Sequence, residues 1–141
     1  MNSADKRARR IADHLLSIEG TGATWNIEIE DAREGYARIA MVVRKDMLNG
    51  HATCHGGMIF ALADTAFAYA CNSRNVETVA QSATIAFLAP GREGDRLVAE
   101  AQEQALSGRS GVYQVTVTNQ NGEKIAVFQG LSRSLGGTVI N

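Results

Sequence analysis

The stretch from Gly57 to Cys71 constrains the fold most, because it is apolar on nearly every side of the helix that it predicts. It is rich in alanine and large apolar residues and contains no proline, a composition typical of an α-helix. A helix on a protein surface keeps one polar face, so we expect this one to be buried all round. Asn72 and Ser73 follow it and predict its end.

Strand patterns lie on both sides of this helix. Before it, residues 25–30 alternate apolar and polar side chains, residues 31–35 form a turn, and residues 36–43 complete a hairpin. After it, we expect four strands at residues 79–88, 96–106, 112–118 and 124–131, separated by turn residues at 90–91, 107–108 and 121–122. A helix capped by Ser3 precedes them all and ends before Gly20 and Gly22.

This order predicts an α+β fold in one domain over residues 1–141, with an antiparallel β-sheet wrapped around one long buried helix and a short N-terminal helix added. That arrangement is the hotdog fold. One layer of sheet leaves the far side of the central helix uncovered. We therefore expect a homo-oligomer in which a second subunit covers that side, with a dimer as the smallest assembly.

Charge and cysteine content exclude several classes of protein. The chain has 14 basic and 15 acidic residues, and a nucleic-acid binder would carry a basic excess. No apolar run approaches the roughly 18 residues of a membrane span, and the N-terminus lacks the apolar centre of a signal peptide. Cys54 and Cys71 do not make a disulfide framework. We expect a cytoplasmic protein that binds neither nucleic acid nor membrane.

Asp64 is the one carboxylate in the long predicted helix. Its neighbours three and four residues away are Phe60, Ala61, Phe67 and Ala68, none of which can pair with a charge. Burying an unpaired carboxylate costs on the order of several kcal/mol, so its presence needs a reason. On the helix alone two interpretations are equally favoured: a structural Asp at a subunit interface, or a catalytic carboxylate that faces a cleft.

Gly56 and Gly57 lie where the long helix begins. Backbone N–H groups at this position have no partner within the helix and point outward from the positive end of its dipole. Glycine also lets a substrate carbonyl approach closely, as an oxyanion hole requires. The alternative is that the two glycines only permit a tight junction between loop and helix.

The spacing of Gly56 and Asp64 bears on how a site could form. Eight residues of helix span about 12 Å, too far for both residues to reach one carbonyl group. Two such helices packed antiparallel across a dimer would place Asp64 of one chain beside Gly56 of the other. We therefore expect a composite site, two per dimer.

The segment Asn49-Gly50-His51-Ala52-Thr53-Cys54-His55-Gly56-Gly57, followed by Phe60-Ala61-Leu62-Ala63-Asp64, closely resembles the phenylacetic acid degradation thioesterases of the hotdog superfamily. The resemblance extends through Phe87-Leu88-Ala89-Pro90-Gly91 and Ser110-Gly111-Val112-Tyr113, and covers nearly the whole chain beyond the N-terminal helix. It implies an acyl-CoA thioesterase that hydrolyses phenylacetyl- or hydroxyphenylacetyl-CoA to free acid and CoA. It implies no cofactor, since coenzyme A is part of the substrate, and a homotetramer made of two dimers.

The resemblance also implies a role for each of four residues. Gly56 would donate its backbone N–H to the thioester carbonyl oxygen. Asp64 would attack the carbonyl as nucleophile or activate a water as general base. Asn49 would orient the water or the carboxylate, and His55 would brace the loop or polarise the site. The residues that bind the CoA nucleotide stay unassigned.

Other interpretations of these residues are weaker. His51, Cys54 and His55 lack the paired spacing of a metal site, and adjacent residues rarely face each other as a Cys–His dyad must. A hotdog dehydratase or hydratase would use His55 with Asp64 to move a proton on carbon. A non-catalytic acyl-CoA-binding module would need no buried carboxylate. Release of a free thiol from acyl-CoA separates these alternatives.

Overall fold

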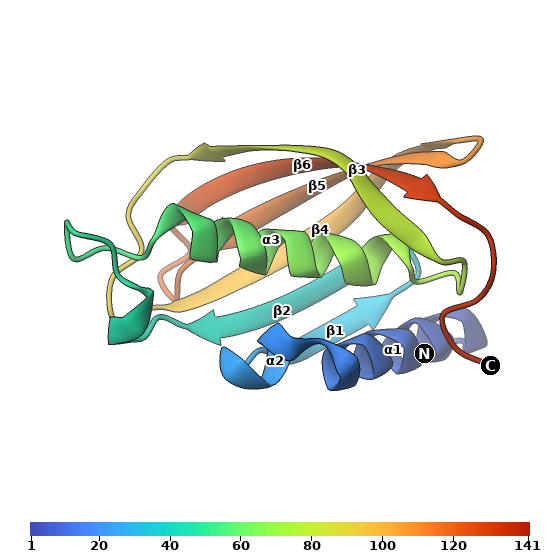
Figure 1. Cartoon of the computed structure of the whole chain (residues 1–141), viewed down its shortest axis with the longest axis horizontal. Helices are drawn as coiled ribbons and strands as arrows, with labels where there is room; N and C mark the ends of the chain where they lie inside the picture. The colour runs from blue at the N-terminus through green and yellow to red at the C-terminus, as the bar shows by residue number, and fades with distance from the viewer.

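The computed structural model describes residues 1–141 and confirms the predicted order of helix, two strands, long helix and four strands (Figure 1). The helices are α1 (Ser3–Ile18), α2 (Gly20–Thr24) and α3 (Gly56–Cys71), with a 3-10 turn η1 at Lys45–Met47. The strands are β1 (Glu28–Arg33), β2 (Tyr36–Val42), β3 (Thr78–Phe87), β4 (Arg96–Ser107), β5 (Ser110–Thr118) and β6 (Lys124–Ser134).

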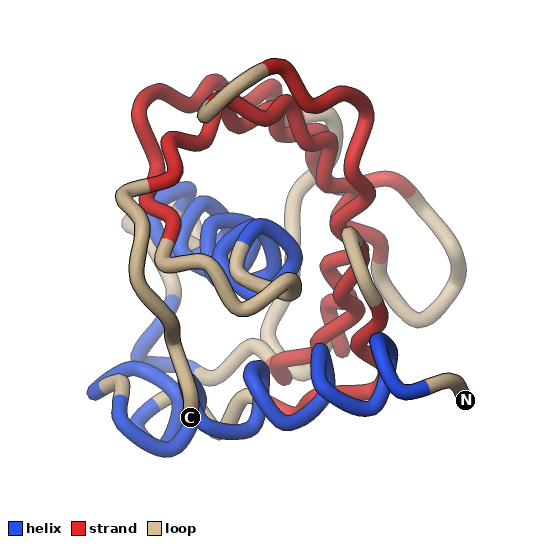
Figure 2. The backbone as a smooth tube through the Cα atoms, turned by 90° about the vertical axis from the view of Figure 1, so that its right-hand side faces the viewer, coloured by secondary structure: helices blue, strands red, loops and turns tan.

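The six strands form one sheet in the order β1-β2-β4-β5-β6-β3, and every neighbouring pair is antiparallel. Figure 2 looks along α3 and shows the sheet curving over this helix while α1 lies beneath. β3, which follows α3 in the chain, lies at one edge of the sheet. The prediction of an α+β fold with a sheet wrapped around a long helix is confirmed.

The core fills the space between α3 and the concave face of the sheet. Alternate residues of each strand point toward the helix, as the period of two requires; in β5 these are Tyr113, Val115 and Val117, all at most 1% exposed. Phe67 of α3 lies 5.5 Å from the Tyr113 ring and 5.7 Å from the Phe128 ring, centroid to centroid. Burial of such aromatic side chains contributes about 1.5–3 kcal/mol each.

In the single chain α3 is buried on the side that faces the sheet and uncovered on its far side, as predicted for one layer of sheet. Leu62, Ala63 and Ala66 are fully buried, but a stripe along the other side of the helix is only partly covered. This open stripe consists of Gly57, Phe60, Ala61, Asp64, Thr65 and Ala68. Its members recur at spacings of three and four residues, so they share one face. A single sheet layer covers only the opposite face.

Several boundaries differ from the predicted ones because side-chain caps and strand partners decide them. Asn2, not Ser3, caps α1: its Oδ1 accepts a hydrogen bond of 2.8 Å from the Asp5 N–H. Residues 31–33, predicted as turn, extend β1 because they pair with β2. The glycines at 20 and 22 fall inside the short helix α2 rather than in a loop. β6 continues to Ser134, where it pairs with Thr78 of β3.

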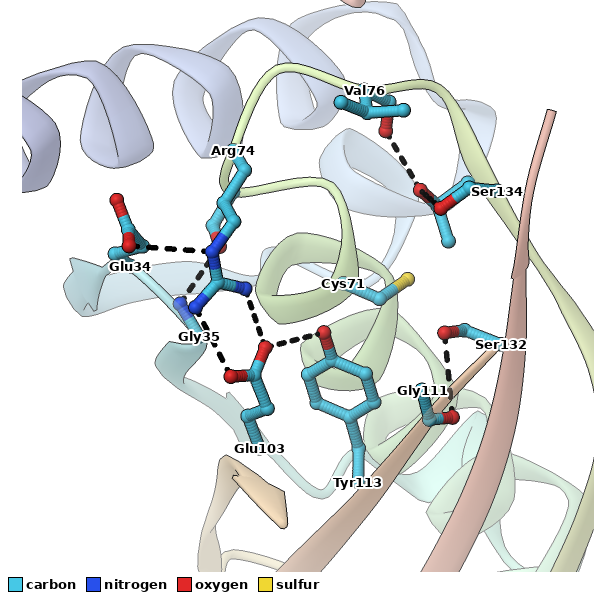
Figure 3. Close-up of polar contacts among 12 residues, drawn as sticks. Glu34, Gly35, Cys71, Arg74, Val76, Glu103, Gly111, Tyr113, Ser132 and Ser134 are labelled. Atoms are coloured by element: carbon cyan, nitrogen blue, oxygen red, sulfur yellow. Dashed lines mark hydrogen bonds and ion pairs between the residues drawn. The ribbon is translucent and has the colours of Figure 1, made fainter. Parts of the chain in front are cut away.

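A polar cluster holds the C-terminal end of α3 in place (Figure 3). Arg74, just after α3, forms an ion pair with Glu34 at 3.2 Å and donates two hydrogen bonds to Glu103 of β4. Tyr113 donates a further hydrogen bond of 2.9 Å to Glu103. Burial raises the pKa of Glu103, but the hydrogen bonds from Arg74 and Tyr113 outweigh it and leave that pKa below its ordinary value. The cluster joins the end of α3 to β4, to β5 and to the turn between β1 and β2.

None of the helices is long and apolar enough to cross a membrane.

Candidate active site

Asn49 organises the loop that leads into α3. Its side-chain Oδ1 accepts hydrogen bonds from the backbone N–H of His51 at 2.9 Å and from the N–H and hydroxyl of Thr53 at 3.2 Å each. These three donors fix which end of the amide is the oxygen. The Nδ2 group makes no hydrogen bond within the chain and is therefore a free donor for a ligand.

His55 caps the N-terminus of α3. Its ring Nδ1 accepts a hydrogen bond of 2.8 Å from the Gly57 N–H, which places the proton of the neutral ring on Nε2. This contact fixes the His55 side chain against the first turn of α3, and its roles in bracing the loop or polarising the site stay predictions. The prediction that Gly57 presents a free N–H is wrong, because this N–H donates its hydrogen bond to the His55 ring. The helix itself begins one residue earlier than predicted, at Gly56.

Gly56 keeps its N–H unpaired. In the first turn of α3, Met58 and Ile59 donate to the His55 carbonyl oxygen at 2.9 and 3.2 Å, and Gly57 donates to the His55 ring. Among the N–H groups of residues 56–59, only that of Gly56 has no acceptor within the chain. It lies at the positive end of the helix dipole, where a developing negative charge is stabilised. For Gly56, the predicted outward donor is present.

A cavity of about 420 Å³ joins Gly56 to Asn49. Its lining includes the polar residues Asn49 and Thr53 and an apolar run at the end of β3. The complete lining is Asn49, Thr53, Cys54, Gly56, Ile59, Phe87, Leu88, Ala89 and Pro90. No individual role was predicted for residues 87–90, although Phe-Leu-Ala-Pro at the end of a strand is an unusually apolar exposed segment.

Asp64 lies apart from this cavity in the single chain. It is on the open stripe of α3, about 12 Å along the helix from Gly56. No side chain pairs with it, and burial raises the pKa of its carboxyl above the ordinary value of 3.8. One chain therefore brings Asn49 and Gly56 together in one cavity, which His55 does not line, and leaves Asp64 two turns away.

Neither cysteine has the properties of a nucleophile. Both are buried, and burial raises the pKa of the Cys54 thiol to about 11 and that of Cys71 to about 12. A reactive cysteine has a lowered pKa instead. The chain also contains no group of three or more His, Cys, Asp or Glu side chains placed to hold a metal ion.

Comparison with known proteins identifies the family. The family model described as Thioesterase superfamily matches residues 51–126, more than half of the chain. The chain belongs to the thioesterase superfamily. The matched segment includes His55, Gly56 and Asp64 of this thioesterase.

Three relatives extend the comparison. The acyl-coenzyme A thioesterase PaaI of Escherichia coli K12 is 49% identical over 94% of this chain and 95% of its own length. Its structure, the E. coli PaaI protein from the phenylacetic acid degradation operon, gives a TM-score of 0.94 at 43% identity, covering 96% of this chain and 99% of that one. A putative esterase of Archaeoglobus fulgidus is 37% identical over 86% of this chain and 79% of its own. A hypothetical thioesterase of Streptococcus pneumoniae with coenzyme A gives a TM-score of 0.78 at 26% identity, covering 80% and 91%.

Proposed function

We propose that this thioesterase hydrolyses aryl-acetyl thioesters of coenzyme A, such as phenylacetyl-CoA, to the free acid and CoA in the cytoplasm. The unpaired Gly56 N–H, which shares a cavity with the free amide group of Asn49, is the observation that carries the proposal. The substrate class is supported by the similar E. coli protein, an acyl-coenzyme A thioesterase from the phenylacetic acid degradation operon.

Each residue has a defined part in this reaction. Gly56 N–H donates to the thioester carbonyl oxygen and stabilises the negative charge that develops on it. Asp64 of the partner subunit either attacks the carbonyl carbon or removes a proton from an attacking water. The carbon–sulfur bond then breaks, and CoA leaves as the thiol when its sulfur takes a proton, either the one that Asp64 removed from the water or one from solvent. Where Asp64 itself attacked, water then hydrolyses the acyl–aspartyl anhydride to release the free acid and the Asp64 carboxylate. The free Nδ2 of Asn49 donates to the water or to the carboxylate.

The geometry of one chain supports a dimer with composite sites. Phe60 is midway between Gly56 and Asp64, and it lies about 16 Å along the helix axis from Cys71, the last residue of α3. β3 runs back along α3 (Figure 1). The same distance of about 16 Å, measured along β3 from its first residue Thr78, covers about five residues and ends at Ala83 in the middle of the strand. A two-fold axis through both midpoints brings Gly56 beside the partner's Asp64 and pairs the two β3 edges antiparallel.

The exposed surface agrees with this arrangement. β3 has a free edge in the sheet, and Val79, Phe87 and Leu88 are 43%, 53% and 59% exposed in the single chain. A long apolar edge strand is prone to pair with another chain. Pairing two copies through β3 also covers the open stripe, which resolves the incomplete burial of α3. The dimer is therefore the catalytic unit in this proposal.

A second surface suits association of two such dimers. The outward-facing residues along the middle of β3, β5 and β6 carry no charge. They are Ser82, Thr84, Val112, Gln114, Thr116, Val127, Gln129 and Leu131. Uncharged, partly apolar faces of this kind are typical of interfaces between subunits. The proposed assembly is a dimer of dimers joined through these sheet faces.

A panel of acyl-CoA substrates tests the proposed function. Purified protein is incubated with phenylacetyl-, hydroxyphenylacetyl-, acetyl- and long-chain acyl-CoA, and free thiol is measured without added metal or nucleotide. We expect faster release from the two aryl-acetyl thioesters. Equal release from all four, or none, would overturn the substrate assignment. Hydration of an enoyl-CoA without thiol release would favour the dehydratase or hydratase alternative.

A further inference from the structure

Phe87 is the last residue of β3, and its position is fixed by the sheet. Ala83, Ile85 and Phe87 alternate along β3, and the first two pack against the core beneath the sheet. Phe87 pairs with Ala126 of β6. The next residue, Leu88, donates a backbone hydrogen bond of 2.8 Å to Ile125. The backbone therefore holds the Phe87 ring over the N-terminal end of α3, although 53% of the residue is exposed.

The ring of Phe87 lies directly against Gly56. A Cβ atom added to Gly56 would be 3.0 Å from Cζ of the ring, and 3.4 and 3.5 Å from Cε1 and Cε2. Gly56 does not adopt a positive φ, so its backbone conformation does not require glycine. A Cβ atom at this distance would instead force the Phe87 ring to shift by a few tenths of an ångström. Glycine at this position therefore serves both the exposed N–H and the contact with Phe87.

We propose that Phe87 is a positioning residue that shields the Gly56 N–H from water and holds the thioester carbonyl against it. The proposal rests on the proposed thioesterase function of this site. A hydrogen-bond donor stabilises a developing oxyanion more strongly where water is excluded, because the local dielectric constant is lower. Phe87 contributes apolar surface to the same cavity that Asn49 and Thr53 line with polar groups.

Steady-state kinetics with phenylacetyl-CoA test this role. Phe87→Ala should lower kcat by about tenfold, less than the roughly 10²-fold loss for removing an oxyanion donor altogether. KM should change much less, because the carbonyl is held most tightly in the transition state. Phe87→Leu keeps an apolar cover and should recover most of the lost kcat. Leu106→Ala, at a 54% exposed position on β4 outside the cavity, is the matched control and should keep wild-type kcat.

A double-mutant cycle isolates the contact between the two residues. Gly56→Ala keeps the N–H but displaces the ring, so it should lower kcat in the wild type and have a smaller effect in the Phe87→Ala background. Activities are compared at concentrations where light scattering gives each variant the wild-type mass. Additive effects, or a Phe87→Ala variant whose KM alone changes, would refute the positioning role while leaving the thioesterase function in place. An inactive wild type would overturn both.

Discussion

Nδ1 of His55 accepts a hydrogen bond of 2.8 Å from the N–H of Gly57, two residues ahead, and so closes the first turn of α3. Loss of an N-cap side chain costs about 1 kcal/mol. His55→Ala should lower the free energy of unfolding by that amount, and His55→Asn, which can also cap, should keep most of it. Urea unfolding of the three proteins measures the difference. Equal stability of His55→Ala and the wild type would show that the cap contributes nothing.

The same pair of variants separates the two roles considered for His55. If the ring only braces the loop, His55→Asn should hydrolyse phenylacetyl-CoA at close to the wild-type rate. If Nε2–H also polarises the site, this variant should be stable but slow, and its kcat measures that contribution.

The pH dependence of turnover should reflect the burial of Asp64. Its carboxyl has to be ionised to attack the thioester or to accept a proton, and burial raises its pKa above 3.8. The value of kcat/KM should therefore fall as the pH decreases through a midpoint above 3.8. A pH–rate profile with phenylacetyl-CoA gives that midpoint, and a rate independent of pH across this range would exclude Asp64 as the ionised group.

Asp64 should make the free energy of unfolding decrease as the pH rises, whereas it makes kcat/KM increase. Because the folded state raises the pKa of this carboxyl, the native protein binds its proton more tightly than the unfolded chain does. Stability therefore decreases as the pH rises from the ordinary value through the raised one. Asp64→Asn has no charge to bury, so its advantage in thermal unfolding over the wild type should grow across that range. An advantage that shrinks with rising pH would contradict the burial of an unpaired carboxylate.

The fold was largely predictable because its strongest signals are local. The apolar run of α3 and the alternation of residues 25–30 are read within single segments, although β1 begins only at Glu28. The extension of β1 over residues 31–33 was missed because it depends on pairing with β2. That one side of α3 stays uncovered in a single chain could be predicted from the single layer of sheet, but composition does not show which of its residues form the open stripe.

The site was predictable in part, for the same physical reason. Asn49, His55 and Gly56 lie within eight residues of sequence, so one loop brings them together. The pairing of the Gly57 N–H with the His55 ring depends on a side-chain rotamer that the sequence does not specify. Phe87 reaches Gly56 only through the pairing of β3 with β6, a contact between distant segments.

Mixing two inactive variants tests most directly whether Gly56 of one chain and Asp64 of the other form one catalytic site. Asp64→Asn removes the carboxylate, and Gly56→Pro removes the N–H at a helix position that tolerates proline. The extended ψ of 134° at His55 suits a residue before proline. Each variant alone should lose about 10²-fold or more in turnover.

When subunits exchange, each mixed dimer contains one intact site. A one-to-one mixture should regain phenylacetyl-CoA hydrolysis at roughly a quarter of the wild-type level, since half of the dimers are mixed and half of their sites are intact. Mass-tagged subunits confirm the exchange. Recovery of activity is the predicted result. Near-normal turnover by Asp64→Asn alone would contradict its catalytic role, and exchanged mixtures that stay inactive would contradict the two-chain site.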